Sequence, residues 1–201
     1  ADDRATLWRM FARPLAILVI FLGLFVSRQD VLLIVGSLLF VFFLLDALRM
    51  IVPRLEAAFH RTTWLGAQFL RESERGRISA YTDFLLGIFL PLLLFRQSIA
   101  YATLCFLSVG GLWAKIVEEN YARTRLFQRS TTSLQASLAF LAACIGVAYF
   151  LWIGGVLPLW VGLVGAAIAT LSQIIPSQID DNVSVPVVSG AIMQFVLRLF
   201  A

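Results

Sequence analysis

The sequence predicts an all-α membrane protein: a single-domain polytopic helical bundle with about seven transmembrane helices. Of its 201 residues, 60% are hydrophobic and only 14% are charged, and the mean hydropathy is +0.89. Globular chains carry about 25% charged residues, so the composition excludes an ordinary soluble enzyme. The apolar runs are continuous, which is typical of helices that cross a bilayer.

Seven apolar runs are the predicted spans. They cover residues 14–26, 31–48, 78–95, 99–114, 133–153, 157–173 and 185–200, and the cytoplasmic connections between them are 49–77, 115–132 and 174–184. Three arginines precede the first run and no small-x-small cleavage pattern follows it, so we expect a retained anchor and not a signal peptide. Apolar residues recur at helical spacing within 49–77, which predicts an interfacial amphipathic helix there.

The basic residues divide unevenly between the two sides that seven spans would define. Thirteen lie in the N-terminal tail and in connections 49–77 and 115–132, whereas Arg28, Arg96 and Arg198 fall on the other side. The positive-inside rule therefore predicts a cytoplasmic N-terminus and a C-terminus on the opposite side. The acidic connection 174–184 then shares the cytoplasmic face with both basic ones. We expect membrane lipids as partners of this face, and no nucleic acid.

The connection 174–184 contains Asp180, Asp181 and Asn182 and no basic residue. One interpretation is a site for a cation or for a cation-bound phosphate, because hard ions take oxygen ligands. The other is a solvated turn that caps the next helix, with Pro186 in its first turn. The single histidine and the absence of a Cys-His cluster argue against zinc. The two cysteines, Cys105 and Cys144, lie in apolar runs and are predicted to be buried thiols.

Two more acids lie close to predicted spans. Asp46 precedes Arg49 by three residues, which predicts an ion pair along one helix face. Asp83 falls about one turn into the third apolar run, where a carboxylate is costly and indicates a functional position, with Arg75 or Arg77 as its partner. The mixed-charge run 71–77 either binds a phosphate or pairs internally, and the sequence favours neither.

Four segments carry a family resemblance. Residues 71–79 with 84–87 form an acidic-basic run that leads into a span, 108–114 with 121–123 resemble Gly-Asp-x-x-Ala followed by aromatic-Gly-Arg, 132–140 resemble Lys-Ser-Leu-Glu-Gly-Ser-Leu-Ala, and 179–186 match Asp-Asn-x-x-x-Pro. From about residue 44 to 190, the chain thus resembles the CTP-dependent lipid-alcohol kinases. These are dolichol kinase, phytol kinase and the CTP-using diacylglycerol kinases, which are related to the phosphatidate cytidylyltransferases.

The resemblance implies phosphoryl transfer from CTP to a lipid hydroxyl at the cytoplasmic face, with Mg²⁺ as cofactor. It implies that Asp180 and Asp181 hold the metal and that Asn182 assists in binding the nucleotide. The phosphates of CTP would be bound by arginines, namely Arg75, Arg77, Arg123 and Arg125. Asp83 or Glu74 would position or deprotonate the hydroxyl of the lipid alcohol.

The chain also departs from the family pattern at charged positions. Gly111, Thr132 and Gln135 stand where the family has Asp, Lys and Glu, and Gln173 replaces an acid. A second hypothesis is therefore a non-catalytic relative, acting as a membrane subunit with protein partners or as a lipid-binding protein. Because function lies in the site and not in the fold, both hypotheses stay open. A transporter is a weaker third, since the sequence has no inverted repeat.

Overall fold

The computed structural model describes residues 14–52, 78–121, 133–175 and 179–200, and these residues form a bundle of helices. In chain order the helices are α2 (Pro14–Phe25), α3 (Arg28–Ile51), α6 (Ala80–Leu94), α7 (Gln97–Cys105), the π-helical turn η2 (Phe106–Gly110), α8 (Gly111–Tyr121), α9 (Leu134–Ile153), α10 (Leu159–Ile174) and α11 (Asp181–Phe200). The predicted all-α class is confirmed for this part of the chain. α7, η2 and α8 follow one another without a break, as one long helix.

Four of these helices are long and apolar enough to cross a membrane. They are α3, the continuous helix from Gln97 to Tyr121, α9 and α11. α2, α6 and α10 are equally apolar in character but shorter. The described part of the chain is thus suited to a membrane.

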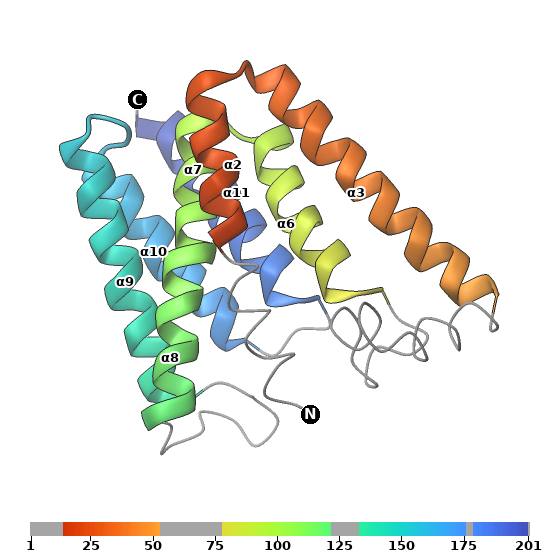
Figure 1. The fold of residues 1–201 in the computed structure, drawn as a ribbon. Coiled ribbons are helices and arrows are strands. Elements are labelled where there is room, and N and C mark those ends of the chain that lie inside the picture. The colour runs from red at the N-terminus through yellow and green to blue at the C-terminus, as the bar shows by residue number, and fades with distance from the viewer. Residues whose placement is uncertain (1–13, 53–77, 122–132, 176–178, 201) are drawn as a thin grey trace.

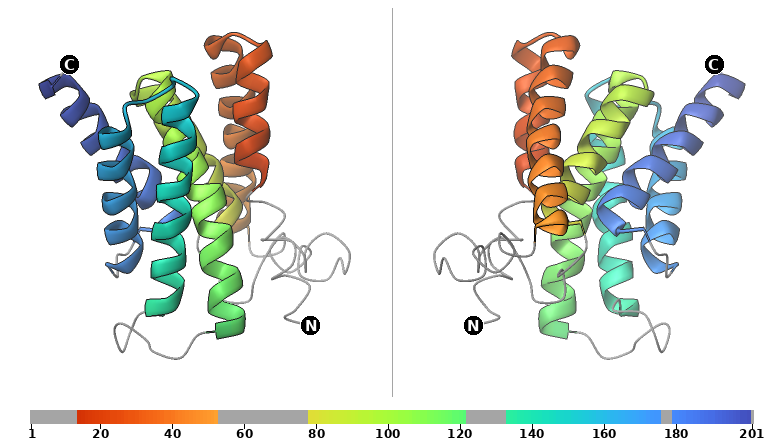
Figure 2. Two further views of the ribbon diagram at one scale, coloured as in Figure 1. Left: turned by 90° about the vertical axis from the view of Figure 1, so that its left-hand side faces the viewer. Right: turned by 90° about the vertical axis from the view of Figure 1, so that its right-hand side faces the viewer.

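Successive helices run in alternate directions (Figures 1 and 2). As a result, α3, α8 and α10 end, and α6, α9 and α11 begin, at the same end of the bundle. We call this the connection end, because the three predicted polar connections leave from it and return to it. α3 lies at the edge of the bundle, beside α6.

Several helices extend beyond their predicted boundaries. The fourth predicted span was to end at residue 114, but the helix continues through Lys115 to Tyr121, because polar residues such as Lys and Glu do not end a helix. The last helix begins at Asp181 and not at residue 185, so Pro186 lies inside α11 and not in its first turn. Arg49 belongs to α3, while the predicted amphipathic helix falls on residues outside the described ranges.

The bundle has two groups of buried side chains. One lies among α7, η2, α9, α10 and α11 and includes Phe106, Phe140 and Met193. The other lies among α2, α3, α6 and α7 and includes Val31 and Ile88. Many large apolar side chains on the outside remain exposed, as expected of a surface that faces lipid.

At the end of the bundle opposite the connection end, polar side chains tie helix termini together. The guanidinium of Arg28 donates from Nη2 to the carbonyl oxygens of Leu92, at 2.5 Å, and Phe95, at 2.8 Å. Leu92 lies in the last turn of α6 and Phe95 directly follows the helix, so their carbonyls have no donor within the helix. The amide of Arg96 donates to Oε1 of Gln194 at 3.0 Å. α3 and α11 are thereby both fixed to the junction between α6 and α7.

Candidate functional site

At the connection end, a buried carboxylate joins α3 to α6. Oδ2 of Asp46 accepts from the amide and hydroxyl of Ser79, both at 2.8 Å, and from Oγ1 of Thr82 at 2.7 Å. Oδ1 lies 3.4 Å from Nη2 of Arg49, which confirms the predicted ion pair. Ser79 is the N-cap of α6, so an acid near the end of α3 binds the residue that caps α6.

A second carboxylate repeats this arrangement between α8 and α9. Oε2 of Glu118 accepts from the amide of Ser133 at 2.8 Å and from its hydroxyl at 2.5 Å. Ser133 is the N-cap of α9, and its Oγ in turn accepts from the amide of Ala136. The sequence pattern did not indicate a role for Glu118. A serine directly before an apolar run was the available signal for the cap, but nothing in the sequence pairs it with an acid fifteen positions earlier.

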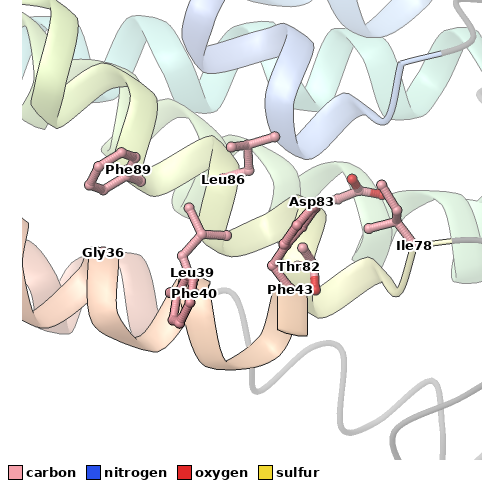
Figure 3. A pocket seen from close by; sticks show the side chains of 9 residues that line it. All are labelled: Gly36, Leu39, Phe40, Phe43, Ile78, Thr82, Asp83, Leu86 and Phe89. Carbon is pink, nitrogen blue, oxygen red and sulfur yellow. The ribbon is translucent and has the colours of Figure 1, made fainter. Parts of the chain in front are cut away.

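An apolar groove of about 330 Å³ lies between α3 and α6, with Asp83 at one end (Figure 3). Its walls are built largely from aromatic and aliphatic side chains of the two helices: Leu39, Phe40, Phe43, Leu86 and Phe89. Gly36 and Phe89 lie toward one end, and Thr82 and Asp83 toward the other. Such a groove combines a long hydrocarbon surface with one carboxylate.

The position of Asp83 explains how a carboxylate is accommodated there. It lies in the first turn of α6 and is partly buried. The positive end of the helix dipole stabilises negative charge in a first turn. The neighbouring Thr82 donates its hydroxyl proton to Asp46, so the groove end is continuous with the buried network between α3 and α6. The predicted partners Arg75 and Arg77 lie outside the described residues.

α6 and α11 cross in direct contact at Gly87 and Asn182. A Cβ atom at Gly87 would collide with the backbone carbonyl of Asn182. Pro186 stands four residues after Asn182, and Pro91 stands four residues after Gly87. Proline has no N–H, so the backbone carbonyls of Gly87 and Asn182 do not receive the usual α-helical hydrogen bond from the residue four positions later. Two of the segments that carry the family resemblance, 84–87 and 179–186, are therefore in contact.

Asp180 caps the start of α11. Its Oδ1 accepts from the amide of Asn182 at 2.8 Å, and its backbone carbonyl accepts from the amides of Val183 and Ser184, both at 3.0 Å. Asp180 and Asp181 are both exposed. Within the described ranges, no group of three or more His, Cys, Asp or Glu side chains could together hold a metal ion. The capping interpretation of this turn accounts for one carboxylate oxygen of Asp180.

Three of the positions that depart from the family pattern lie at the ends of described helices, and Thr132 lies outside the described ranges. Gly111 is buried at the start of α8. It follows Gly110, and a Cβ atom added at Gly110 would lie 2.7 Å from Sγ of Cys144. Gln135 is partly buried in the first turn of α9. Oε1 of Gln173 is buried and has no hydrogen-bond partner in the part of the chain that the structure describes. An aspartate at position 111 would place a charged side chain at this buried start of α8.

Five of the predicted site residues fall outside the described ranges: Glu74, Arg75, Arg77, Arg123 and Arg125. Of the predicted acids, Asp83 lies at the end of the groove, and Asp180 and Asp181 lie at the start of α11. α11 crosses α6 one helical turn beyond Asp83, at Gly87. The connection end therefore gathers these three acids on two helices that are in contact.

Over the described ranges, these features define a class: a helical bundle with helices suited to a membrane and an apolar groove that has Asp83 at one end. No protein-family model, curated protein or solved structure matches the chain. The likeness to the lipid-alcohol kinases therefore rests on its four segments alone.

Proposed function

We propose that this protein is a multi-pass membrane protein that binds a lipid alcohol in the groove between α3 and α6. In this proposal the hydrocarbon chain lies along the groove and the hydroxyl donates to Asp83. The observation that carries the proposal is the groove itself, which is apolar along its length and has Asp83 at one end. At about 330 Å³ it lies at the small end of the range of ligand pockets, about 300–1,000 Å³.

The proposed topology has seven spans, a cytoplasmic N-terminus and a C-terminus on the opposite side. It is supported by the alternating directions of the helices and by the thirteen basic residues assigned to the tail and two connections. In this orientation the connection end, and with it Asp83, faces the cytoplasm. A lipid alcohol would present its hydroxyl at that level, where headgroups lie.

Recognition would depend on Asp83 more than on the hydrocarbon. Inside a bilayer the hydrophobic effect does not drive a chain into a protein groove, because lipid tails are as apolar as the groove. Shape and the hydrogen bond of the hydroxyl must then supply the preference. A carboxylate has acceptor sites for several donors, so Asp83 can bind the hydroxyl beside the contacts it makes within the protein.

A second candidate function is phosphoryl transfer from CTP to the bound alcohol. The contact between Gly87 and Asn182 favours it, because this contact brings together two segments that resemble the lipid-alcohol kinases. A Mg²⁺ ion that arrives with a nucleotide needs only one or two protein carboxylates, which Asp180 and Asp181 could supply. Asn182 and the four arginines of the connections would bind CTP, and Asp83 or Glu74 would accept the hydroxyl proton.

Photo-crosslinking tests the proposal directly. The purified protein in lipid nanodiscs would be exposed to a long-chain alcohol that carries a photoreactive group, and the labelled peptides mapped. We expect labelling of α3 and α6 beside the groove, reduced about fivefold by Asp83→Asn, because a hydrogen bond to a charged acceptor is worth about 1 kcal/mol more than one to a neutral acceptor. Asp30→Asn is the matched control, because Asp30 also lies in the first turn of a helix, α3.

The same preparation separates the two candidate functions. Labelling elsewhere, or equal labelling in Asp83→Asn, would refute binding in the groove. Transfer of radiolabelled phosphate from CTP to the alcohol in the presence of Mg²⁺ would establish the kinase function. Binding without transfer would identify the non-catalytic, lipid-binding function.

A further inference from the structure

The groove has a definite end opposite Asp83. A Cβ atom added at Gly36 would lie 3.0 Å from Cε2 of Phe89, so the aromatic ring of α6 lies directly over the backbone of α3. Figure 3 shows Phe89 beside Gly36, at the opposite end of the groove from Asp83. A side chain at position 36 would require the ring to move away by a few tenths of an ångström. The pair therefore bridges the two helices at this level.

The length of the groove follows from helix geometry. Phe89 stands six positions after Asp83 on α6. At a rise of 1.5 Å per residue, this interval spans about 9 Å. An extended chain with C–C bonds of about 1.5 Å and angles near 111° covers about seven to eight bonds in that distance. The space between Asp83 and Phe89 thus matches roughly eight carbons.

We propose that Phe89, seated on Gly36, sets the length of hydrocarbon that the groove holds. This inference rests on the proposed function, since it takes the hydroxyl at Asp83 as the fixed point. Carbons near the hydroxyl pack against Phe43, Leu39 and Phe40, and each added carbon gains contacts that the loosely packed bilayer does not offer. Beyond about eight carbons, the ring turns the chain out of the groove into surrounding lipid, where further carbons add nothing.

Competition by straight-chain alcohols tests this length limit. The photoreactive alcohol would be displaced by alcohols of six to fourteen carbons, with all amounts expressed as mole fractions in the nanodisc bilayer so that partitioning cancels. In the unaltered protein, we expect competition to strengthen up to about eight carbons and then to level off. In Phe89→Ala, the strengthening should continue over several more carbons. Phe89→Leu, which keeps most of the buried volume, should move the plateau in the same direction by less.

Phe40→Ala is the matched control, because Phe40 lines the side of the groove and not its end. It should weaken competition at every chain length and leave the plateau in place. If alcohols compete but the plateau is unchanged in both Phe89 variants, the length limit is overturned while binding in the groove stands. If no alcohol competes at any length, or if Asp83→Asn changes nothing, the proposed function itself fails.

Discussion

The backbone carbonyl of Asn182 fits against Gly87, in the space that any side chain at that position would occupy. The contact joins α6 to α11. In each helix a proline stands four residues after the contact residue, so the carbonyls of Gly87 and Asn182 both lack the usual helical hydrogen bond. Small residues allow membrane helices to approach closely and to gain packing contacts. This crossing fixes the start of α11, and therefore Asp180 and Asp181, relative to Asp83.

Gly87→Ala should lower stability clearly, because the atom that a methyl group would meet belongs to the backbone of Asn182 and cannot rotate away. Overpacking of this kind costs about 1–3 kcal/mol. Thermal unfolding of the detergent-solubilised protein measures it. Gly146→Ala is the control, since a Cβ there meets nothing within 4 Å and alanine favours a helix over glycine. Equal melting temperatures for the two variants would contradict the close contact.

Asp46→Asn should destabilise the bundle more than any exposed change from Asp to Asn. Asp46 accepts three hydrogen bonds at Oδ2 and faces Arg49, and both side chains are buried. Removing one partner of a buried ion pair costs about 3–5 kcal/mol. Asp30→Asn, at an exposed position, should change the melting temperature little. A loss no greater in Asp46→Asn than in Asp30→Asn would show that the network contributes little.

Glu118 and Ser133 should behave as one unit. Glu118→Gln weakens the bond to the cap, and Ser133→Ala removes both the cap and the hydroxyl that Glu118 accepts from. The loss of an N-cap costs about 1 kcal/mol. Unfolding of both single variants and the double variant gives a coupling energy, and we expect the double variant to lose less than the sum. Strict additivity would mean that Glu118 does not act through Ser133.

Asp180→Ala should lower the melting temperature through the lost cap of α11, by an amount that does not depend on Mg²⁺. The capping bond to the amide of Asn182 is typically worth about 1 kcal/mol. The melting temperature would be measured with and without Mg²⁺ and CTP, alongside Asp181→Asn. A rise with Mg²⁺ and CTP that disappears in both variants would instead support the metal site of the kinase hypothesis.

Cysteine labelling tests the proposed topology. Cysteines introduced at Arg61 and Arg123 should react with a membrane-impermeant reagent from the cytoplasmic side, and one at Arg96 only from the other side. Arg96 is exposed at the junction between α6 and α7, so the reagent can reach it. Labelling of positions 96 and 123 from the same side would refute an odd number of spans between them.

The sequence predicted the helices well because continuous apolar runs impose them, and it predicted the pair of Asp46 and Arg49 because three residues along a helix bring side chains together. The predicted end of the fourth span was too early. The apolar run ends near Lys115 because several polar residues follow, but the helix continues through them to Tyr121. The sequence could not predict Glu118 with Ser133, or Gly87 with Asn182. These contacts depend on how separate helices pack, which no local periodicity encodes.

Two helices have a serine N-cap that is hydrogen-bonded to a carboxylate of another helix. Ser79 of α6 is bound by Asp46 of α3, and Ser133 of α9 is bound by Glu118 of α8. Side chains of the helices themselves thus help to set the register of α6 against α3 and of α9 against α8. A chain cut between α3 and α6, or between α8 and α9, would therefore keep the groups that align each pair of helices.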